Sequence, residues 1–155
     1  MLFKLAGPKP ELKGAGPNDQ IALGFIGVGI RGSYLMDVFR KTPGVRAVMV
    51  ADCYDGHLDW AKEATGGKIE VTKDYHDILA RQDIDAVVIA TPDHWHARMV
   101  LDSLAAGKHV YVEKPLTYTI EEGKQIIDAV KKSGKLLMVG SQNKTSTLTA
   151  KAREV

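Results

Sequence analysis

The feature that most constrains the fold of this 155-residue chain is a glycine-rich hexapeptide between two apolar segments. Residues 21–26 (IALGFI) form an apolar run that predicts a buried strand, and residues 27–32 (GVGIRG) follow at once as G-x-G-x-x-G. Apolar side chains then recur at helical spacing from Tyr34 to Phe39. A strand, a glycine turn and a helix in this order are typical of the first unit of a dinucleotide-binding α/β sheet.

Each glycine of the motif would have its own physical task at such a site. Gly27 permits a tight turn, Gly29 lets a pyrophosphate approach the backbone, and Gly32 lets the helix pack closely against the strand. The N–H groups at the helix start, around Ile30 and Arg31, would face the phosphates together with the positive end of the helix dipole. A glycine-rich turn without a ligand is the alternative, because the hexapeptide alone is not specific.

An acidic residue in the expected place favours the dinucleotide interpretation. Residues 45–51 (VRAVMVA) predict a second strand, and Asp52 stands at its end, 20 residues after Gly32. A dinucleotide site needs a carboxylate there to accept hydrogen bonds from the adenosine ribose hydroxyls. A negative charge also repels a 2′-phosphate, so the sequence favours NAD over NADP. Asp52 could instead cap the next helix, and the two roles can coexist.

The rest of the chain continues the alternation of strands and helices. Further strands are predicted at residues 69–72, 86–90, 109–113 and 136–139. Four further helices are predicted between or after these strands. The first carries Leu58 and Ala61 and ends at Gly66-Gly67, and the second begins at Asp74. The third opens at Thr91-Pro92-Asp93 with Pro92 in the first turn, and the fourth runs from a Thr119–Glu122 capping box to Gly134. This pattern predicts an α/β fold, a doubly wound parallel (Rossmann) sheet with strand order 3-2-1-4-5-6, in a single domain over residues 21–145.

The two ends of the chain differ from this pattern. Residues 1–20, rich in glycine and proline, predict an extended or disordered arm. At the other end, Ser146 or Thr147 could cap a final helix that the chain leaves in its second turn. We therefore expect a fragment of a two-domain protein, in which residues 146–155 begin a helix leading to an absent C-terminal substrate domain.

Composition excludes several classes of function. The 21 basic and 19 acidic residues are scattered and form no basic stripe, which argues against a nucleic-acid partner. No run approaches the roughly 18 apolar residues of a membrane span. The apolar start of the chain is too short for a secretory signal, so we expect a cytoplasmic protein, or a periplasmic one if a leader has been removed. Cys53 is the single cysteine, which excludes an internal disulfide.

Four segments in order make the chain resemble a known family. They are GFIGVGIRG (24–32), ATPDHWH (90–96), AGKHVYVEKPL (106–116) and VGSQ (139–142). Together they resemble the N-terminal nucleotide domain of the Gfo/Idh/MocA family over residues 20–155. The resemblance implies an NAD(P)-dependent oxidoreductase that transfers hydride between a nicotinamide cofactor and a sugar- or polyol-like substrate.

The glycine motif and these matches together give a set of candidate site residues. Thr91, Pro92 and His96 match a T-P-x-x-x-H segment that borders the cofactor in the family, and Gln142 matches a polar position after the sixth strand. Lys144 stands near where the family would have an arginine. The candidate cofactor-binding residues are Gly27, Gly29, Ile30, Arg31, Gly32, Asp52, Thr91, Pro92, His96, Glu113 and Gln142.

Lys114 is the candidate catalytic residue. Glu113-Lys114-Pro115 matches the family's E-K-P motif, in which the lysine reaches the nicotinamide end, helps bind the reacting hydroxyl and precedes a commonly cis proline bond. A lysine between a buried strand and a proline would also be partly desolvated, which favours its uncharged form. An ion pair with Glu113, or plain exposure, is the alternative. The family's usual general base is a histidine of the second domain.

The remaining aromatic and histidine residues near this edge do not predict a metal site. His94 and His96 stand two apart, so on a helix they would point to different faces, and the sequence offers no cysteine or histidine cluster to complete a zinc site. A hydrogen bond at the helix start or a cofactor contact is the better interpretation of these histidines. Trp95 is interpreted as a packing residue.

Two other functions remain open. Some members of the resembling family use bound NAD transiently to cleave glycosidic bonds by oxidation and elimination, and a non-catalytic NAD-binding module is a third possibility. We expect this chain alone to bind the cofactor weakly and to catalyse nothing. We also expect it to form a homo-oligomer, because a missing domain would leave apolar surface exposed.

Overall fold

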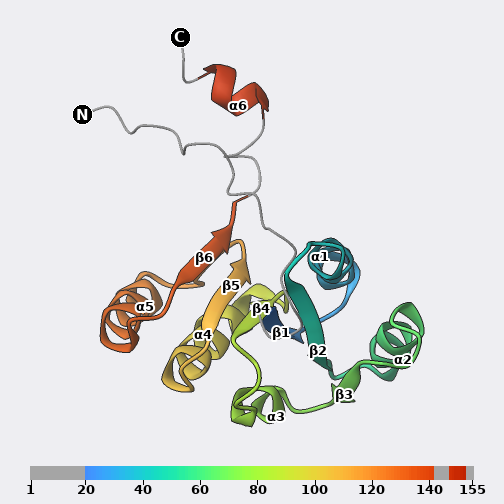
Figure 1. Ribbon diagram of the computed structural model, residues 1–155. Coiled ribbons are helices and arrows are strands. Elements are labelled where there is room, and N and C mark those ends of the chain that lie inside the picture. Colours follow the sequence, from blue (N-terminus) through green and yellow to red (C-terminus); the bar gives the residue numbers. More distant parts are fainter. Residues whose placement is uncertain (1–19, 142–146, 153–155) are drawn as a thin grey trace.

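The computed structural model describes residues 20–141 and 147–152, and its central feature is a six-stranded parallel sheet flanked by helices (Figure 1). The elements in chain order are β1 (Ile21–Ile26), α1 (Ile30–Arg40), β2 (Val45–Ala51), α2 (Asp55–Ala64), β3 (Glu70–Thr72), α3 (Tyr75–Ala80), β4 (Ala86–Ile89), η1 (Asp93–Trp95), α4 (His96–Ala105), β5 (His109–Glu113), α5 (Ile120–Ser133), β6 (Leu137–Gly140) and α6 (Thr147–Ala152). The strand order β3-β2-β1-β4-β5-β6, with every neighbouring pair parallel, confirms the predicted doubly wound sheet.

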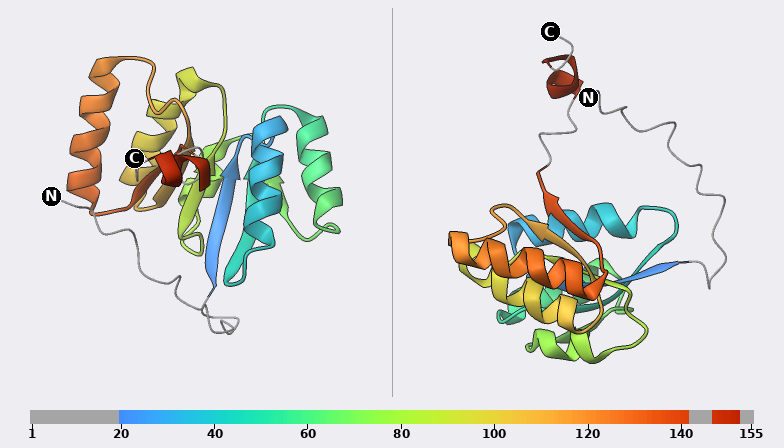
Figure 2. Two further views of the ribbon diagram at one scale, coloured as in Figure 1. Left: turned by 90° about the horizontal axis from the view of Figure 1, so that it is seen from above. Right: turned by 90° about the vertical axis from the view of Figure 1, so that its left-hand side faces the viewer.

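Helices cover both faces of the sheet, and each face has its own apolar cluster. Successive side chains of a strand point to opposite faces, so Phe25 of β1 joins the cluster under α1 and α2, whereas Ile26 joins the cluster under α3, α4 and α5. Figures 1 and 2 show these two helical layers on either side of the strands. Burial on both faces explains why the strands appear in the sequence as nearly continuous apolar runs.

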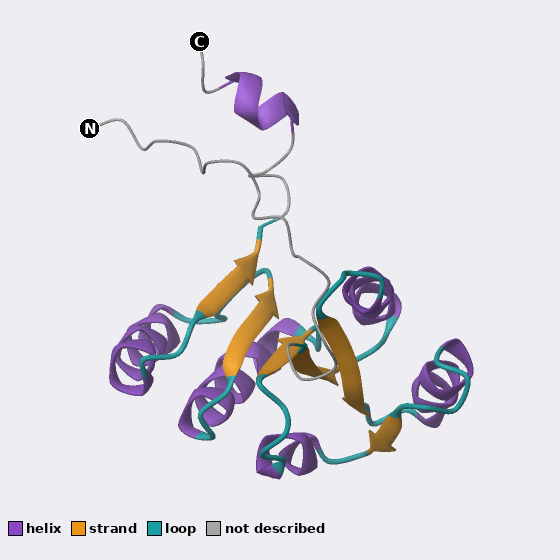
Figure 3. Ribbon diagram, viewed as in Figure 1, coloured by secondary structure: helices purple, strands orange, loops and turns teal. Residues whose placement is uncertain are grey.

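The reversal of strand order places a crevice at one edge of the sheet. From β1 the chain proceeds outward to β3, then crosses back to β4 and proceeds outward in the other direction to β6 (Figure 3). The carboxyl ends of β1 and β4 flank this switch point, which is where ligands bind in open α/β sheets. The glycine turn, the loop after β4 and the end of β5 all lie at this edge.

Most predicted element boundaries are confirmed within one or two residues. The capping box at the start of α5 is present, with Thr119 Oγ1 accepting from Glu122 N (3.3 Å) and Glu122 Oε2 accepting from Thr119 N (3.1 Å). Gly134, with φ of 65°, ends that helix. Within the described residues no helix combines the length and apolarity needed to cross a membrane. The candidates Gln142 and Lys144 and residues 1–19 of the predicted arm lie outside the described residues.

The helix predicted after the glycine turn is present as α1, and its inner stripe runs from Gly32 through Leu35 and Met36, which leaves Tyr34 exposed. One local prediction was wrong in detail. Pro92 does not stand in the first turn of α4. The residues after it form the short 3₁₀ turn η1, and the α-helix begins only at His96.

Candidate active site

Two of the three motif glycines, Gly27 and Gly32, are required by the backbone conformation and packing of the fold, whether or not a ligand is bound. Gly27 has φ of +81°, a conformation that side-chain-bearing residues rarely adopt. Its N–H donates to the Ala51 carbonyl at 2.8 Å, which ties the turn to the end of β2. A β-carbon placed on Gly32 would lie 2.0 Å from the Gly27 carbonyl oxygen. The helix can therefore lie against the turn only if residue 32 has no side chain.

Gly29 differs from these two glycines. Its φ of −63° and ψ of −161° suit any residue, and a β-carbon there would come no closer than 3.4 Å to a described atom, the His57 Cε1. It is the N-cap residue of α1 and provides no side-chain cap, while the first N–H groups of a helix have no acceptor within the helix. The bare backbone at Gly29 thus fits an anionic group that approaches from outside the chain, as a pyrophosphate would.

A cleft of about 720 Å³ lies along the carboxyl ends of β1, β2 and β4. Gly27, Gly29 and Asp52 line it on one side, and its other walls include Tyr75 and Trp95. The interpretation of Trp95 as a packing residue was wrong, because its side chain is about half exposed and faces this cleft. An apolar wall opposite a few polar groups is the usual form of a site for a flat organic ligand.

Asp52 occupies the predicted place but is already engaged within the chain. Its Oδ2 accepts from Val28 N at 2.8 Å and lies 3.1 Å from His57 Nδ1, and its Oδ1 accepts from Tyr54 N at 3.0 Å. The carboxylate therefore joins the end of β2 to the glycine turn and to the start of α2. His57 is not among the candidates predicted from the sequence, where its only signal is its position in the first turn of the helix after Asp52.

A second recess, of about 290 Å³, opens beside the E-K-P motif. Arg31 of α1 and Glu113 of β5 meet at its wall: Arg31 Nε and Nη2 lie 2.8 and 2.7 Å from Glu113 Oε1. The Glu113 side chain is only 7% exposed. Both residues had been predicted to contact the cofactor. The structure pairs them with each other across 82 positions of sequence.

Lys114 also lines this recess. The prediction that its side chain is partly desolvated is wrong for the part of the chain that the structure describes. The Lys114 side chain is exposed, because β5 ends at Glu113 and the chain leaves the sheet there. The peptide bond to Pro115 is cis, as the resemblance implied. Glu113 is engaged by Arg31, so the carboxylate that could have paired with the Lys114 ammonium belongs to another ion pair.

His96 joins the two motifs that flank this recess. Its ring is buried, with Nδ1 2.6 Å from the Pro115 carbonyl oxygen and Nε2 2.9 Å from the Thr91 carbonyl oxygen. The side chain therefore fixes the T-P-x-x-x-H loop to the E-K-P turn, and both ring nitrogens already have acceptors in the chain. Among the described residues, no three histidine, cysteine or acidic side chains gather as a metal site would need.

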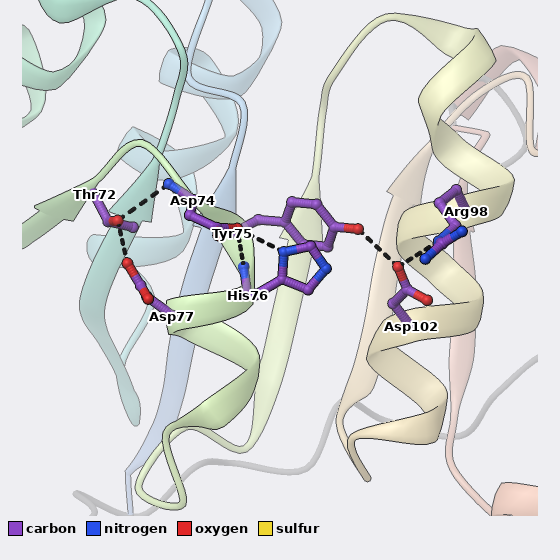
Figure 4. Close-up of polar contacts among 7 residues, drawn as sticks. All are labelled: Thr72, Asp74, Tyr75, His76, Asp77, Arg98 and Asp102. Atoms are coloured by element: carbon purple, nitrogen blue, oxygen red, sulfur yellow. Dashed lines mark hydrogen bonds and ion pairs between the residues drawn. The ribbon is translucent and has the colours of Figure 1, made fainter.

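A polar network supports the wall of the large cleft (Figure 4). Tyr75 reaches from α3 to α4, where its hydroxyl donates to Asp102 Oδ2 at 2.7 Å, and Arg98 Nε donates to the same oxygen at 2.7 Å. Burial and the neighbouring Asp102 raise the pKa of Tyr75 to about 12. Burial alone would raise the pKa of Asp102, but the hydrogen bonds from Arg98 and Tyr75 outweigh it and hold that pKa below its usual value.

Tyr75→Phe tests the contribution of this network to stability. We expect the free energy of unfolding at pH 7, measured by urea denaturation, to fall by about 0.5–1.5 kcal/mol because one hydrogen bond is lost. The folded-state pKa of Asp102 is lowered, so the network stabilises the fold fully above the unfolded value of about 3.9 and less as the pH falls through the folded value. The difference in unfolding free energy between wild type and Tyr75→Phe should therefore be smaller at pH 3 than at pH 7. An equal difference at both pH values would contradict the link to the ionised Asp102. Tyr118→Phe, at an exposed position, is the control.

Comparisons with known proteins agree with this geometry. The model of an oxidoreductase family with an NAD-binding Rossmann fold, GFO_IDH_MocA, matches residues 21–141. A glycosyl hydrolase family 109 protein of Shewanella sp. (strain W3-18-1) is 37% identical over 129 residues, which are 78% of this chain and 28% of that protein. The structure of scyllo-inositol dehydrogenase from Lactobacillus casei with bound cofactor NAD(H) and scyllo-inositol is 28% identical with a TM-score of 0.80, over 87% of this chain and 40% of that one. An NAD-binding protein from Listeria innocua is 31% identical with a TM-score of 0.74, over 81% and 36% of the two chains. The chain thus spans less than half the length of each of these relatives.

Proposed function

Because the chain belongs to the Gfo/Idh/MocA oxidoreductase family and matches its NAD-binding Rossmann domain over residues 21–141, we propose that it serves hydride transfer between NAD and an alcohol carbon of a sugar- or polyol-like substrate. One observation carries the proposal: the turn with the bare Gly29 backbone and the E-K-P lysine lie at the same edge of the sheet, lining adjoining recesses. Thr91 lines both recesses and so marks where they meet.

The described residues would divide the work of binding and positioning. When bound, the nicotinamide ring supplies the carbon that accepts hydride. The Gly29 backbone and the N–H groups at the start of α1 would hold the pyrophosphate, and Asp52 would take part in binding the adenosine ribose and favour NAD over NADP. Lys114, exposed at the mouth of the smaller recess, would donate a hydrogen bond to the reacting hydroxyl or accept its proton.

The length of the relatives supports a division of labour between domains. We propose residues 21–145 as the cofactor domain, with residues 1–20 as an arm and residues 146–155 leading to a substrate domain. In this arrangement the chain alone binds NAD but lacks the groups that position an alcohol, and positioning can be worth about 7–11 kcal/mol of a reaction barrier. We therefore propose that it is inactive without them.

Lys114→Met in the gene product that contains this chain tests the catalytic assignment. We expect kcat for a polyol substrate to fall about 10²–10⁴-fold, the usual contribution of a positioned acid or base. The Kd for NAD should change little, because the pyrophosphate and ribose contacts are made elsewhere. Lys124→Met, at an exposed position on α5, is the matched control. An unchanged kcat, with substrate turnover followed by reduced-nicotinamide absorbance, would remove Lys114 from the chemistry.

A second candidate function is favoured by the glycosyl hydrolase family 109 relatives, which are 35–37% identical to this chain. The same cofactor domain could support glycosidic cleavage by transient oxidation and elimination, with no net redox change. The two functions differ in a simple measurement. Hydride transfer to free NAD raises reduced-nicotinamide absorbance in step with product, whereas the glycosidase releases sugar from an aryl glycoside with no accumulation of reduced nicotinamide.

A further inference from the structure

We propose that His57 is a cofactor-contacting residue that makes the site select NAD over NADP, by accepting a hydrogen bond from the 2′-hydroxyl of the adenosine ribose. The inference rests on the proposed function, because it presumes that a dinucleotide occupies the large cleft. His57 lines that cleft from the first turn of α2, at the carboxyl end of β2. It refines the expectation from sequence, which assigned this selection to Asp52 alone.

Asp52 has little capacity left for a ligand. A carboxylate offers about four lone-pair positions, and three are taken by Val28 N, Tyr54 N and the His57 ring. The Asp52 side chain is 8% exposed, whereas that of His57 is 40% exposed. Of this pair, the imidazole is therefore the group that mainly faces the cleft.

The orientation of the His57 ring is fixed from two sides. Nδ1 lies 3.1 Å from Asp52 Oδ2, and the Tyr54 ring meets the imidazole edge-on at a centroid distance of 5.0 Å and an interplanar angle of 87°. Gly56 makes room for this arrangement, because a β-carbon there would lie 2.6 Å from Tyr54 Cε1. Asp52, Tyr54, Gly56 and His57 thus form one local unit that holds the imidazole in place before any ligand arrives.

This orientation determines what the exposed nitrogen can bind. Asp52 can only accept, so Nδ1 carries the proton and Nε2 of the neutral ring is an acceptor. The ring lies against Gly29: a β-carbon on Gly29 would be 3.4 Å from Cε1 and 3.9 Å from Nε2. The imidazole therefore reaches from Asp52, where the adenosine ribose is expected, towards Gly29, where the pyrophosphate is expected. An acceptor there suits the hydroxyl of NAD, which can donate, and opposes the phosphate of NADP, which offers further acceptors and negative charge.

The test is titration calorimetry of NAD and NADP with the wild-type chain and three variants at pH 8, where an ordinary imidazole is neutral. His57→Phe keeps the ring and its edge contact but removes both nitrogens. We expect it to weaken NAD binding about fivefold, the value of one neutral hydrogen bond, and to leave NADP nearly unchanged. His57→Arg replaces the acceptor by donors and a positive charge, so we expect NADP to bind about tenfold more tightly than it does to wild type. His76→Phe, the same substitution on an exposed ring outside the lining of the cleft, should change neither affinity.

The outcomes separate the inference from the proposed function. Wild type that binds neither dinucleotide would overturn both. Wild type that prefers NAD, together with His57→Phe and His57→Arg proteins that keep the wild-type ratio of affinities and a native far-UV circular dichroism spectrum, would overturn the role of His57 alone. The role of His57 is supported if His57→Phe prefers NAD over NADP less strongly than wild type does, and if His57→Arg binds NADP more tightly than wild type does. Should the phenylalanine variant fail to fold, the arginine variant decides the question by itself.

Discussion

Gly29→Val is expected to weaken NAD binding about a hundredfold or more while leaving the fold intact, whereas Gly32→Ala is expected to destabilise the fold itself. At Gly29 the backbone is in an ordinary conformation and the nearest described atom to an added β-carbon belongs to the His57 side chain, at 3.4 Å, so the chain can accept the substitution. The new side chain would occupy the space through which a pyrophosphate reaches the helix start. Hydrogen bonds to charged groups are worth about 1.5–3 kcal/mol each, so losing two weakens binding about a hundredfold or more.

At Gly32 the clash is with the backbone of the glycine turn. An added β-carbon would lie 2.0 Å from the Gly27 carbonyl oxygen and 2.9 Å from its carbon, so α1 must move away from the turn. We expect a loss of about 3 kcal/mol or more of unfolding free energy, at the upper end of overpacking effects. Urea denaturation followed by circular dichroism and calorimetry with NAD measure the two effects. If Gly29→Val binds NAD as wild type does, the glycine turn is only structural, and a stable Gly32→Ala protein would refute the packing argument.

The sheet could be predicted from sequence because its determinants are local. Residues 21–26 and 86–90 are apolar throughout, residues 45–51 are apolar except for Arg46, and each segment is followed by a glycine, aspartate or proline signal that ends the strand. Handedness and switch-point rules then leave few arrangements for such alternating units. The cis bond before Pro115 could be predicted only through the family resemblance.

The site was less predictable because its contacts join distant segments. Nothing near Arg31 in the sequence indicates that its partner is Glu113, and the exposure of Lys114 depends on what covers the end of β5. His57 stands close to Asp52 in the sequence, but its relation to Gly29 exists only once β1 and β2 pair. Weak cofactor binding, inactivity and self-association of the isolated chain stay predictions.

The Arg31–Glu113 pair should give the largest coupling of any two residues at this edge of the sheet. Glu113 is nearly buried, and its remaining neighbours are weak donors: the Tyr111 hydroxyl is 3.5 Å from Oε1 and Lys114 N is 3.3 Å from Oε2. Gly140 of β6 leaves room for the carboxylate, since a β-carbon there would lie 2.8 Å from Oε1. The surrounding structure is therefore built to hold a charged carboxylate whose one cationic partner among these contacts is Arg31.

Arg31→Met is expected to lower the unfolding free energy by about 2–3 kcal/mol, since removing one partner of a buried pair costs about 3–5 kcal/mol and the Arg31 side chain is 36% exposed. Glu113→Gln should cost about 1 kcal/mol, because the remaining guanidinium can reach water and the neutral amide tolerates burial. The double variant should then be more stable than Arg31→Met alone, so the two losses do not add. Urea denaturation of wild type, the two single variants and the double variant gives the coupling free energy of the pair as a double-mutant cycle. Additive losses would mean that the pair contributes no coupling free energy, and that Arg31 is free to bind the cofactor as predicted from the sequence.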